Sequence, residues 1–174
     1  MNLNDKKCLL AYYSRKGNNY INGNIENLEI GNTEIIANMI KEFIDCDLFK
    51  IDTIKEYPLD YTKTTKIAKK ELNDNFRPEL NDTVKNMNQY DVIILGYPNW
   101  WNTMPMAVFT FLESYNFADK IIIPYCTNEG SHLGNSITDI KKLCPNSEIK
   151  EGLSILGYNS KNSKNDVEKW LINV

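Results

Sequence analysis

The feature that most constrains the fold is a set of short, almost continuously apolar runs. They occupy residues 6–14 (KKCLLAYYS), 91–97 (DVIILGY) and 120–126 (KIIIPYC). A strand without polar alternation must be buried on both faces, and parallel sheets covered by helices provide that environment. The three runs therefore predict strands of a parallel sheet that lies between two layers of helices.

Segments with helical periodicity separate these runs. Residues 33–45 follow the first run and repeat apolar side chains at Ile36, Met39, Ile40 and Phe43, which is the spacing of one helical face. The other predicted elements are strands at 46–52 and 148–158 and helices at 62–74, 104–115, 135–144 and 165–174. Five strand–helix pairs in series predict an α/β fold with a three-layer, doubly wound, five-stranded parallel sheet, in a single domain over residues 1–174.

Charge and cysteine content argue against several other classes of protein. The 174-residue chain has a formal net charge of −3 and no block of basic residues, so no nucleic acid partner is expected. The four cysteines are far apart and form no CxxC pair, which indicates neither a zinc site nor a disulfide scaffold. No apolar run is long enough for a membrane helix, and the N-terminal segment lacks the order of a signal peptide. We therefore expect a cytoplasmic protein with no metal site and no membrane partner.

The loop after the first strand is the candidate phosphate site. In open parallel sheets, ligands bind beyond the carboxyl ends of the strands. This loop begins with Ser14 and Arg15 and ends with 31–33 (GNT) at the start of a helix. Free backbone N–H groups and the helix dipole favour an anion at such a position. The alternative is that Asn32 or Thr33 only caps the helix.

A polar insertion, residues 18–30, divides the phosphate loop. Within it, Asn22-Gly23 is typical of a tight hairpin turn. The chain contains neither a Walker A sequence nor GxGxxG, and it lacks the GxSxG elbow of hydrolases. The common nucleotide-binding motifs and a serine triad are therefore excluded as explanations of the loop.

Two adjacent tryptophans follow the strand at 91–97, in the segment 96–105 (GYPNWWNTMP). Because an indole is broad, flat and stiff, this loop predicts a wall for a planar ring system. Neighbouring side chains in an extended loop point in different directions, so we expect one indole to stack on the ligand and the other to pack inward. Trp100 is the favoured stacking residue. The alternative is that Trp100 and Trp101 both belong to the core.

The loop after the strand at 120–126 is rich in small residues and backbone donors. It reads 126–136 (CTNEGSHLGNS), and Gly130 and Gly134 allow turns that other residues resist. Such a loop suits hydrogen bonds to the edge of a heterocycle. His132 is the only histidine, and with no acid or cysteine paired to it we interpret it as a loop residue rather than a proton donor.

Together these segments resemble the flavodoxin family of FMN-binding electron carriers. The resemblance rests on 12–18 (YYSRKGN), 31–40 (GNTEIIANMI), 96–113 (GYPNWWNTMPMAVFTFLE) and 126–145 (CTNEGSHLGNSITDIKKLCP). It implies the strand order 2-1-3-4-5. It also implies that the FMN phosphate binds in the loop after the first strand and that the isoalloxazine lies between the loops after the third and fourth strands.

The family's binding positions fall on a definite set of residues in this sequence. For the phosphate they are Ser14, Arg15, Asn32 and Thr33, with Lys16 and Asn18 as further candidates; for the ring they are Pro98, Asn99, Trp100, Trp101, Asn102, Thr103, Thr127, Asn128, Glu129 and Gly130. An aromatic residue after the second strand covers the other flavin face in the family, which implies Tyr61 or Tyr57.

The resemblance implies a carrier that shuttles electrons between a reductase and an acceptor protein. The alternative is an FMN-dependent NAD(P)H oxidoreductase that acts on quinones or similar acceptors, and a flavin-free interaction module is the least favoured hypothesis. The lack of a dinucleotide fingerprint favours the carrier. The chain departs from the family in three respects. Its phosphate loop is split by an insertion, and its net charge of −3 is less negative than that of many flavodoxins. It also has no glycine between Asp52 and Tyr61, whereas family members often have a glycine near the flavin N5.

Overall fold

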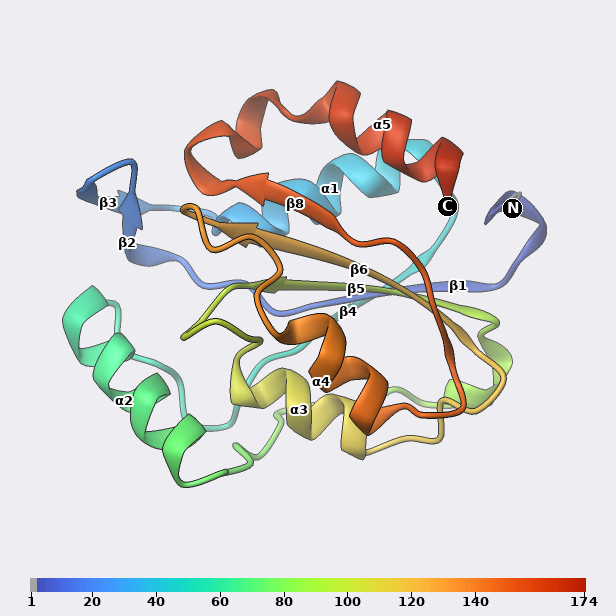
Figure 1. Ribbon diagram of the computed structural model, residues 1–174, viewed down its shortest axis with the longest axis horizontal. Coiled ribbons are helices and arrows are strands. Elements are labelled where there is room, and N and C mark those ends of the chain that lie inside the picture. The colour runs from blue at the N-terminus through green and yellow to red at the C-terminus, as the bar shows by residue number, and fades with distance from the viewer. Residues whose placement is uncertain (1–2) are drawn as a thin grey trace.

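The computed structural model describes residues 3–174 and contains one main sheet between helices (Figure 1). The strands of this sheet are β1 (Cys8–Tyr12), β4 (Asp47–Lys50), β5 (Val92–Pro98), β6 (Ile121–Asn128), β7 (Glu148–Ile149) and β8 (Leu153–Leu156). They run in the order β4-β1-β5-β6-β7, β8 also pairs with β6, and all pairs are parallel. With β7 and β8 taken as two parts of one strand, the predicted five-stranded sheet in the order 2-1-3-4-5 is confirmed.

The last predicted strand, 148–158, is interrupted. β7 pairs with Ile121 and Ile122, and β8 pairs with β6 only from Tyr125 onward. The interruption coincides with Pro124, which lies two residues after Ile122 and therefore faces the same neighbouring strand. Because proline has no N–H to donate, the ladder is weakened at this point. The end of the predicted strand forms a 3-10 helix instead, η3 (Gly157–Asn162).

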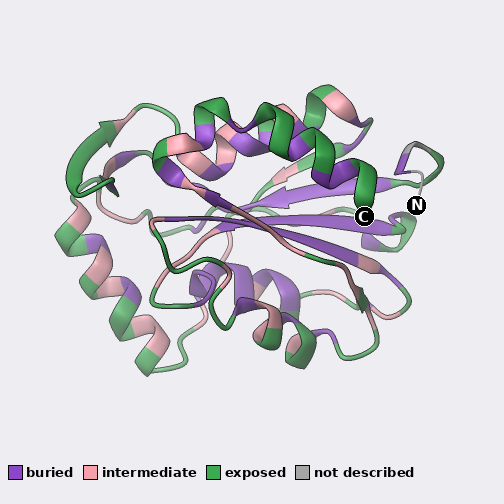
Figure 2. Cartoon of the chain, turned by 45° about the horizontal axis from the view of Figure 1, so that its top comes forward, coloured by how far each residue is buried: buried purple, intermediate pink, exposed green. Residues whose placement is uncertain are grey.

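Helices cover both faces of the sheet, as its continuous apolar strands require. They are α1 (Asn32–Phe43), α2 (Tyr61–Asn73), α3 (Met106–Glu113), α4 (Ser136–Leu143) and α5 (Lys164–Asn173), and two further 3-10 turns are η1 (Leu3–Asp5) and η2 (Met87–Gln89). In β1, Cys8, Leu10 and Tyr12 pack on the side of α1 and α5, whereas Leu9 and Ala11 pack on the side of α3 and α4. Figure 2 shows the buried central strands and the largely buried α3, with the exposed residues of the other helices on their outer sides. Across residues 3–174, none of the helices combines the length and apolar character that a bilayer crossing requires.

The insertion in the first loop forms a separate hairpin of β2 (Gly17–Ile21) and β3 (Asn24–Leu28). Asn22 and Gly23 form its turn, with φ angles of 44° and 90°. Both values are positive, as the tight two-residue turn of a hairpin requires, so the turn predicted from Asn-Gly is confirmed. The hairpin projects beyond the sheet, near the first turn of α2 (Figure 1).

A close approach between β5 and β6 depends on Gly96. This residue pairs with Tyr125 of β6, and a Cβ at position 96 would lie 2.1 Å from Tyr125 Cζ. The fully buried Tyr125 donates from its hydroxyl to the carbonyl of Thr33 at 3.2 Å. Gly96 therefore leaves room for the ring that attaches the start of α1 to the sheet.

Gly96→Ala should lower the free energy of unfolding by about 1–3 kcal/mol, because the added methyl overpacks a fully buried contact. Urea unfolding followed by circular dichroism measures this loss. In a Tyr125→Leu background the smaller side chain should relieve most of the penalty. An equal loss in both backgrounds would show that the tyrosine ring is not its cause.

Candidate functional site

A cavity of about 750 Å³ opens at the carboxyl ends of β1, β5 and β6. Its walls come from the loops after these strands, the first turn of α1, the hairpin strand β2 and one side of α2. The volume lies in the range of cofactor sites. The winding of the sheet reverses between β1 and β5, so the cavity occupies the position where open α/β sheets bind ligands.

Most of the residues predicted from the sequence line this cavity. They are Ser14, Arg15, Asn32, Thr33, Tyr61, Pro98, Asn99, Trp100, Trp101, Asn102, Thr127, Asn128 and Glu129. The remaining five, Lys16, Asn18, Tyr57, Thr103 and Gly130, are not among its lining residues. Thr103 is buried and donates to Asp139 Oδ2 at 2.6 Å, which ties the tryptophan loop to α4. Ligand binding by the lining residues stays a prediction.

The start of α1 forms one polar end of the cavity. Gly31 is the N-cap residue and no side chain at this position caps the helix, so the alternative that Asn32 or Thr33 is the cap is wrong. A Cβ at Gly31 would lie 2.3 Å from Ser14 Oγ, so only glycine lets the loop after β1 pack this closely. Ser14 Oγ accepts from the Glu34 N–H at 3.1 Å. The Glu34 N–H also donates to the Gly31 carbonyl at 3.1 Å, so the N–H groups of Asn32 and Thr33, the first two helical residues, are the ones suited to an anion.

The Thr33 side chain joins this helix start to the loop after β6. Its hydroxyl lies 2.8 Å from the Thr127 hydroxyl, and both residues are buried. Asn32 accepts from the Ser160 hydroxyl of η3 at 2.9 Å. Contacts between the start of α1, the loop after β6 and η3 therefore fix this end of the cavity.

Arg15 holds the hairpin in place. Its guanidinium donates to the carbonyls of Pro58 and Leu59 at 2.8 and 2.6 Å, and to the carbonyl of Asn18 at 2.6 Å. Burial lowers the pKa of Arg15 from its usual value. Because these carbonyls occupy most of its donors, we assign Arg15 to clamping the base of the hairpin against the loop before α2, rather than to an anion.

The two tryptophans lie in one tight turn, residues 100–103. Trp101 and Asn102 have φ angles of 53° and 70°, and Trp100 and Thr103 pair across the turn as an isolated bridge. The reversal sends the two indoles in different directions, as expected. Trp100 makes edge-to-face contacts with Tyr13 and Tyr57, with ring centroids 5.3 and 5.2 Å apart. Trp101 is 47% exposed and donates from its indole N–H to the Thr65 carbonyl at 3.0 Å.

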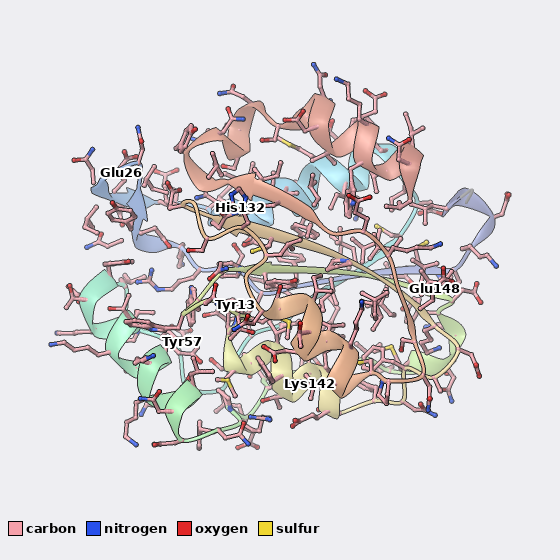
Figure 3. All side chains as sticks on the ribbon, viewed as in Figure 1. Tyr13, Glu26, Tyr57, His132, Lys142 and Glu148 are labelled. Atoms are coloured by element: carbon pink, nitrogen blue, oxygen red, sulfur yellow. The ribbon has the colours of Figure 1, made fainter. Side chains whose placement is uncertain are left out.

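The structure distinguishes the two tyrosines predicted to cover a flavin face. Tyr57 packs beside Tyr13 and donates to Glu71 Oε2 at 2.6 Å (Figure 3). Burial, together with this carboxylate, raises the pKa of Tyr57 well above its usual value. Tyr61 lines the cavity and stacks with Tyr20 of the hairpin, with ring centroids 6.3 Å apart. Tyr61 is therefore the available aromatic residue.

The loop after β6 is organised by Asn128 and Glu129. The Asn128 Oδ1 accepts from the N–H groups of Gly130 and His132, both at 2.9 Å. Glu129 accepts from the Asn22 N–H at the hairpin tip at 2.9 Å, so it fastens the far end of the hairpin. His132 is exposed and is not among the cavity-lining residues, which agrees with its interpretation as a loop residue (Figure 3).

Sequence reasoning missed one wall of the cavity. The additional lining residues are Asn19, Tyr20, Thr64, Thr65, Ala68, Lys69 and Ser131. Tyr61, Thr64, Thr65 and Ala68 follow the spacing of one helical face, and they are small or aromatic among lysines. That pattern is a usable signal, but in the predicted helix at 62–74 lysines lie between these residues and hide it. Asn19 and Tyr20 lie in an insertion that no motif describes.

Comparison with known proteins identifies the family. The flavodoxin family model matches residues 28–174, most of the chain. The protein therefore belongs to the flavodoxin family, as its resemblance implies. No curated protein matches the chain.

Solved structures show the same fold. A provisionally assigned flavoprotein from Bacteroides eggerthii DSM 20697 is 28% identical, with a TM-score of 0.78, over 97% of this chain and 98% of that chain. A flavoprotein in complex with FMN from Lactobacillus acidophilus NCFM is 21% identical, with a TM-score of 0.65, over 95% and 98%. A flavodoxin from Streptococcus pneumoniae TIGR4 is 13% identical, with a TM-score of 0.54, over 95% and 94%. At their lower identities, the last two show likeness of fold alone.

Arg15→Ala should lower the free energy of unfolding by about 1.5–3 kcal/mol, the scale of hydrogen bonds to a charged group. Urea unfolding measures this loss, and amide exchange should increase across residues 17–28. Lys16→Ala is the matched control, because Lys16 is next to Arg15 in the sequence and its side chain is exposed. Removing it should change the free energy of unfolding by less than about 0.5 kcal/mol. Equal losses in both variants would refute the clamp.

Proposed function

We propose that the cavity binds FMN and that the protein carries electrons between redox partners. The observation that carries this proposal is the meeting, in one cavity, of a helix start with free N–H groups and a loop that contains two tryptophans. Membership of the flavodoxin family supports it, as does the shared fold of the Lactobacillus acidophilus flavoprotein in complex with FMN.

The donor set fits the two ends of FMN. At the polar end, the N–H groups of the first turn of α1, with the hydroxyls of Ser14 and Thr33, would hold the phosphate. The close packing at Gly31 lets the Ser14 hydroxyl lie beside this helix start. The flat end is bordered by the loops 98–102 and 127–129, which would contact the isoalloxazine. Aromatic stacking there contributes about 0.5–1.5 kcal/mol beyond area burial.

The protein's own residues would orient the cofactor and limit access to it. Bound FMN supplies the capacity to accept and donate electrons. Trp100, fixed by Tyr13 and Tyr57, stays the favoured stacking residue because its ring is already held in place. Tyr61 and Tyr20 border the cavity from α2 and the hairpin, and so exclude water from that side.

FMN should show saturable fluorescence quenching on titration and should bind more tightly than riboflavin, because riboflavin lacks the phosphate. Thr33→Ala should narrow this difference by about 1–2 kcal/mol, the scale of a hydrogen bond to a charged group. Thr138→Ala, an exposed threonine on α4, is the control and should leave both affinities unchanged. Added FMN that stays as fluorescent as free FMN would refute the proposal, and an equal loss for both flavins would remove Thr33 from the phosphate site.

A carrier and an NAD(P)H oxidoreductase differ in how their flavin is reduced. Trp100 and Tyr61 line the cavity, and aromatic side chains over the ring would block a stacked nicotinamide, so NADH or NADPH alone should reduce the bound flavin slowly. Added ferredoxin–NADP reductase should accelerate the reduction. Anaerobic stopped-flow absorbance measures both rates. Rapid bleaching by either nucleotide alone, followed by turnover of a quinone, would instead establish the oxidoreductase.

A further inference from the structure

The outer face of α2, which borders the cavity, is basic. Lys63, Lys66, Lys69 and Lys70 are all exposed, and their spacing places them along one side of the helix. Lys69 also lines the cavity. With Lys66 and Lys70 it lines a second, shallower groove of about 440 Å³, and Trp101 belongs to both hollows. Positive charge therefore lies directly beside the cavity mouth.

The acidic residues of α2 and of its two caps already have partners, and one of them, Asp74, lines the groove itself. Asp60 accepts from a backbone N–H of the first turn at 2.7 Å. Glu71 accepts from the hydroxyl of Tyr57 at 2.6 Å and so faces the interior. Asp74 pairs with Lys70 at the end of the helix. These carboxylates offset Lys70 and stabilise the helix, but they leave the rest of the lysine face without a pairing acid.

Three of the lysines are free of ion pairs. Among residues 3–174, no salt bridge involves Lys63, Lys66 or Lys69. Lys69 Nζ lies 4.6 Å from the ring centroid of Trp101, the most exposed of the tryptophans. The protein as a whole has a net charge of −3, so the positive charge of this face is opposite in sign to the net charge of the protein.

We infer that the lysine face of α2, together with Trp101, is the docking surface for an electron-transfer protein that presents carboxylates around its redox centre. The inference rests on the proposed function, because it places the docking surface at the mouth of the FMN cavity. Charge complementarity identifies the partner: a basic patch on an acidic molecule selects and orients an acidic surface, and accelerates its approach. The groove beside Trp101 receives the partner's carboxylates.

The test uses a strongly acidic plant-type ferredoxin as the probe partner and isothermal titration calorimetry at low ionic strength as the first readout. Lys63→Glu/Lys66→Glu reverses two charges on the face without touching a cavity-lining residue. Lys141→Glu/Lys169→Glu, on α4 and α5, makes the same change in net charge at exposed positions away from α2. The α2 variant should bind ferredoxin at least about tenfold more weakly, and the control should bind almost as the wild type does.

Electron transfer gives the second readout. One electron leaves the reduced [2Fe–2S] cluster of ferredoxin, whose potential is low enough to reduce a flavin, and enters the bound FMN. The second-order rate constant should fall about tenfold in the α2 variant at low salt, and the difference should vanish at high salt. Oxidation of the reduced protein by the anion ferricyanide should slow in the same variant, whereas oxidation by the cation hexaammineruthenium(III) should accelerate. A general structural defect would not produce opposite signs.

Several outcomes would overturn the inference. The first is that the wild type shows no detectable binding of ferredoxin at low salt. The second is that both double variants lose the same affinity for ferredoxin. The third is that the groove binds NADPH in the wild type and no longer binds it in Lys63→Glu/Lys66→Glu. Each of these is compatible with normal FMN binding. The first two leave the proposed function intact, whereas uptake of NADPH would favour the oxidoreductase over the carrier. Failure of the wild type to quench FMN would overturn the proposed function, and the inference with it.

Discussion

Parallel pairing of β1, β5 and β6, buried on both faces, is the constraint on which the rest of the structure depends. It forces every connection to cross over the sheet, and so brings the loops that follow these strands to one edge. It also fixes where α1 begins, because Tyr125 of β6 donates to the carbonyl of Thr33. The helix start and the tryptophan loop therefore share a cavity because the strands that precede them share a sheet.

The parallel sheet and three of the cavity walls could be predicted because each depends on a local signal, whereas the strand order was implied only by the resemblance to the flavodoxin family. Continuous apolar strands indicate burial on both faces, Asn22-Gly23 indicates a hairpin turn, and the loops after such strands lie at the ligand edge. The different directions of Trp100 and Trp101 also follow from local geometry. These features need no knowledge of which distant segments meet.

The features that escaped prediction depend on such distant contacts. Arg15 resembles an anion ligand in sequence, but its donors meet the carbonyls of Pro58 and Leu59, which only the folded chain brings near. The interruption of the last strand follows from Pro124 on its neighbour rather than from its own residues. The α2 wall was missed because its cavity-facing residues alternate with lysines, and a polar helix gives no sign of what it packs against.

Trp101 has a left-handed backbone conformation that glycine adopts freely and that costs other residues roughly 1–2 kcal/mol. Selection for thermal resistance alone would therefore favour glycine at this position. The same exchange would remove the indole that borders both the cavity and the basic groove. Stability and ligand contact thus make opposite demands on one residue. Directed evolution for heat tolerance, without a check on function, would tend to remove this part of the site.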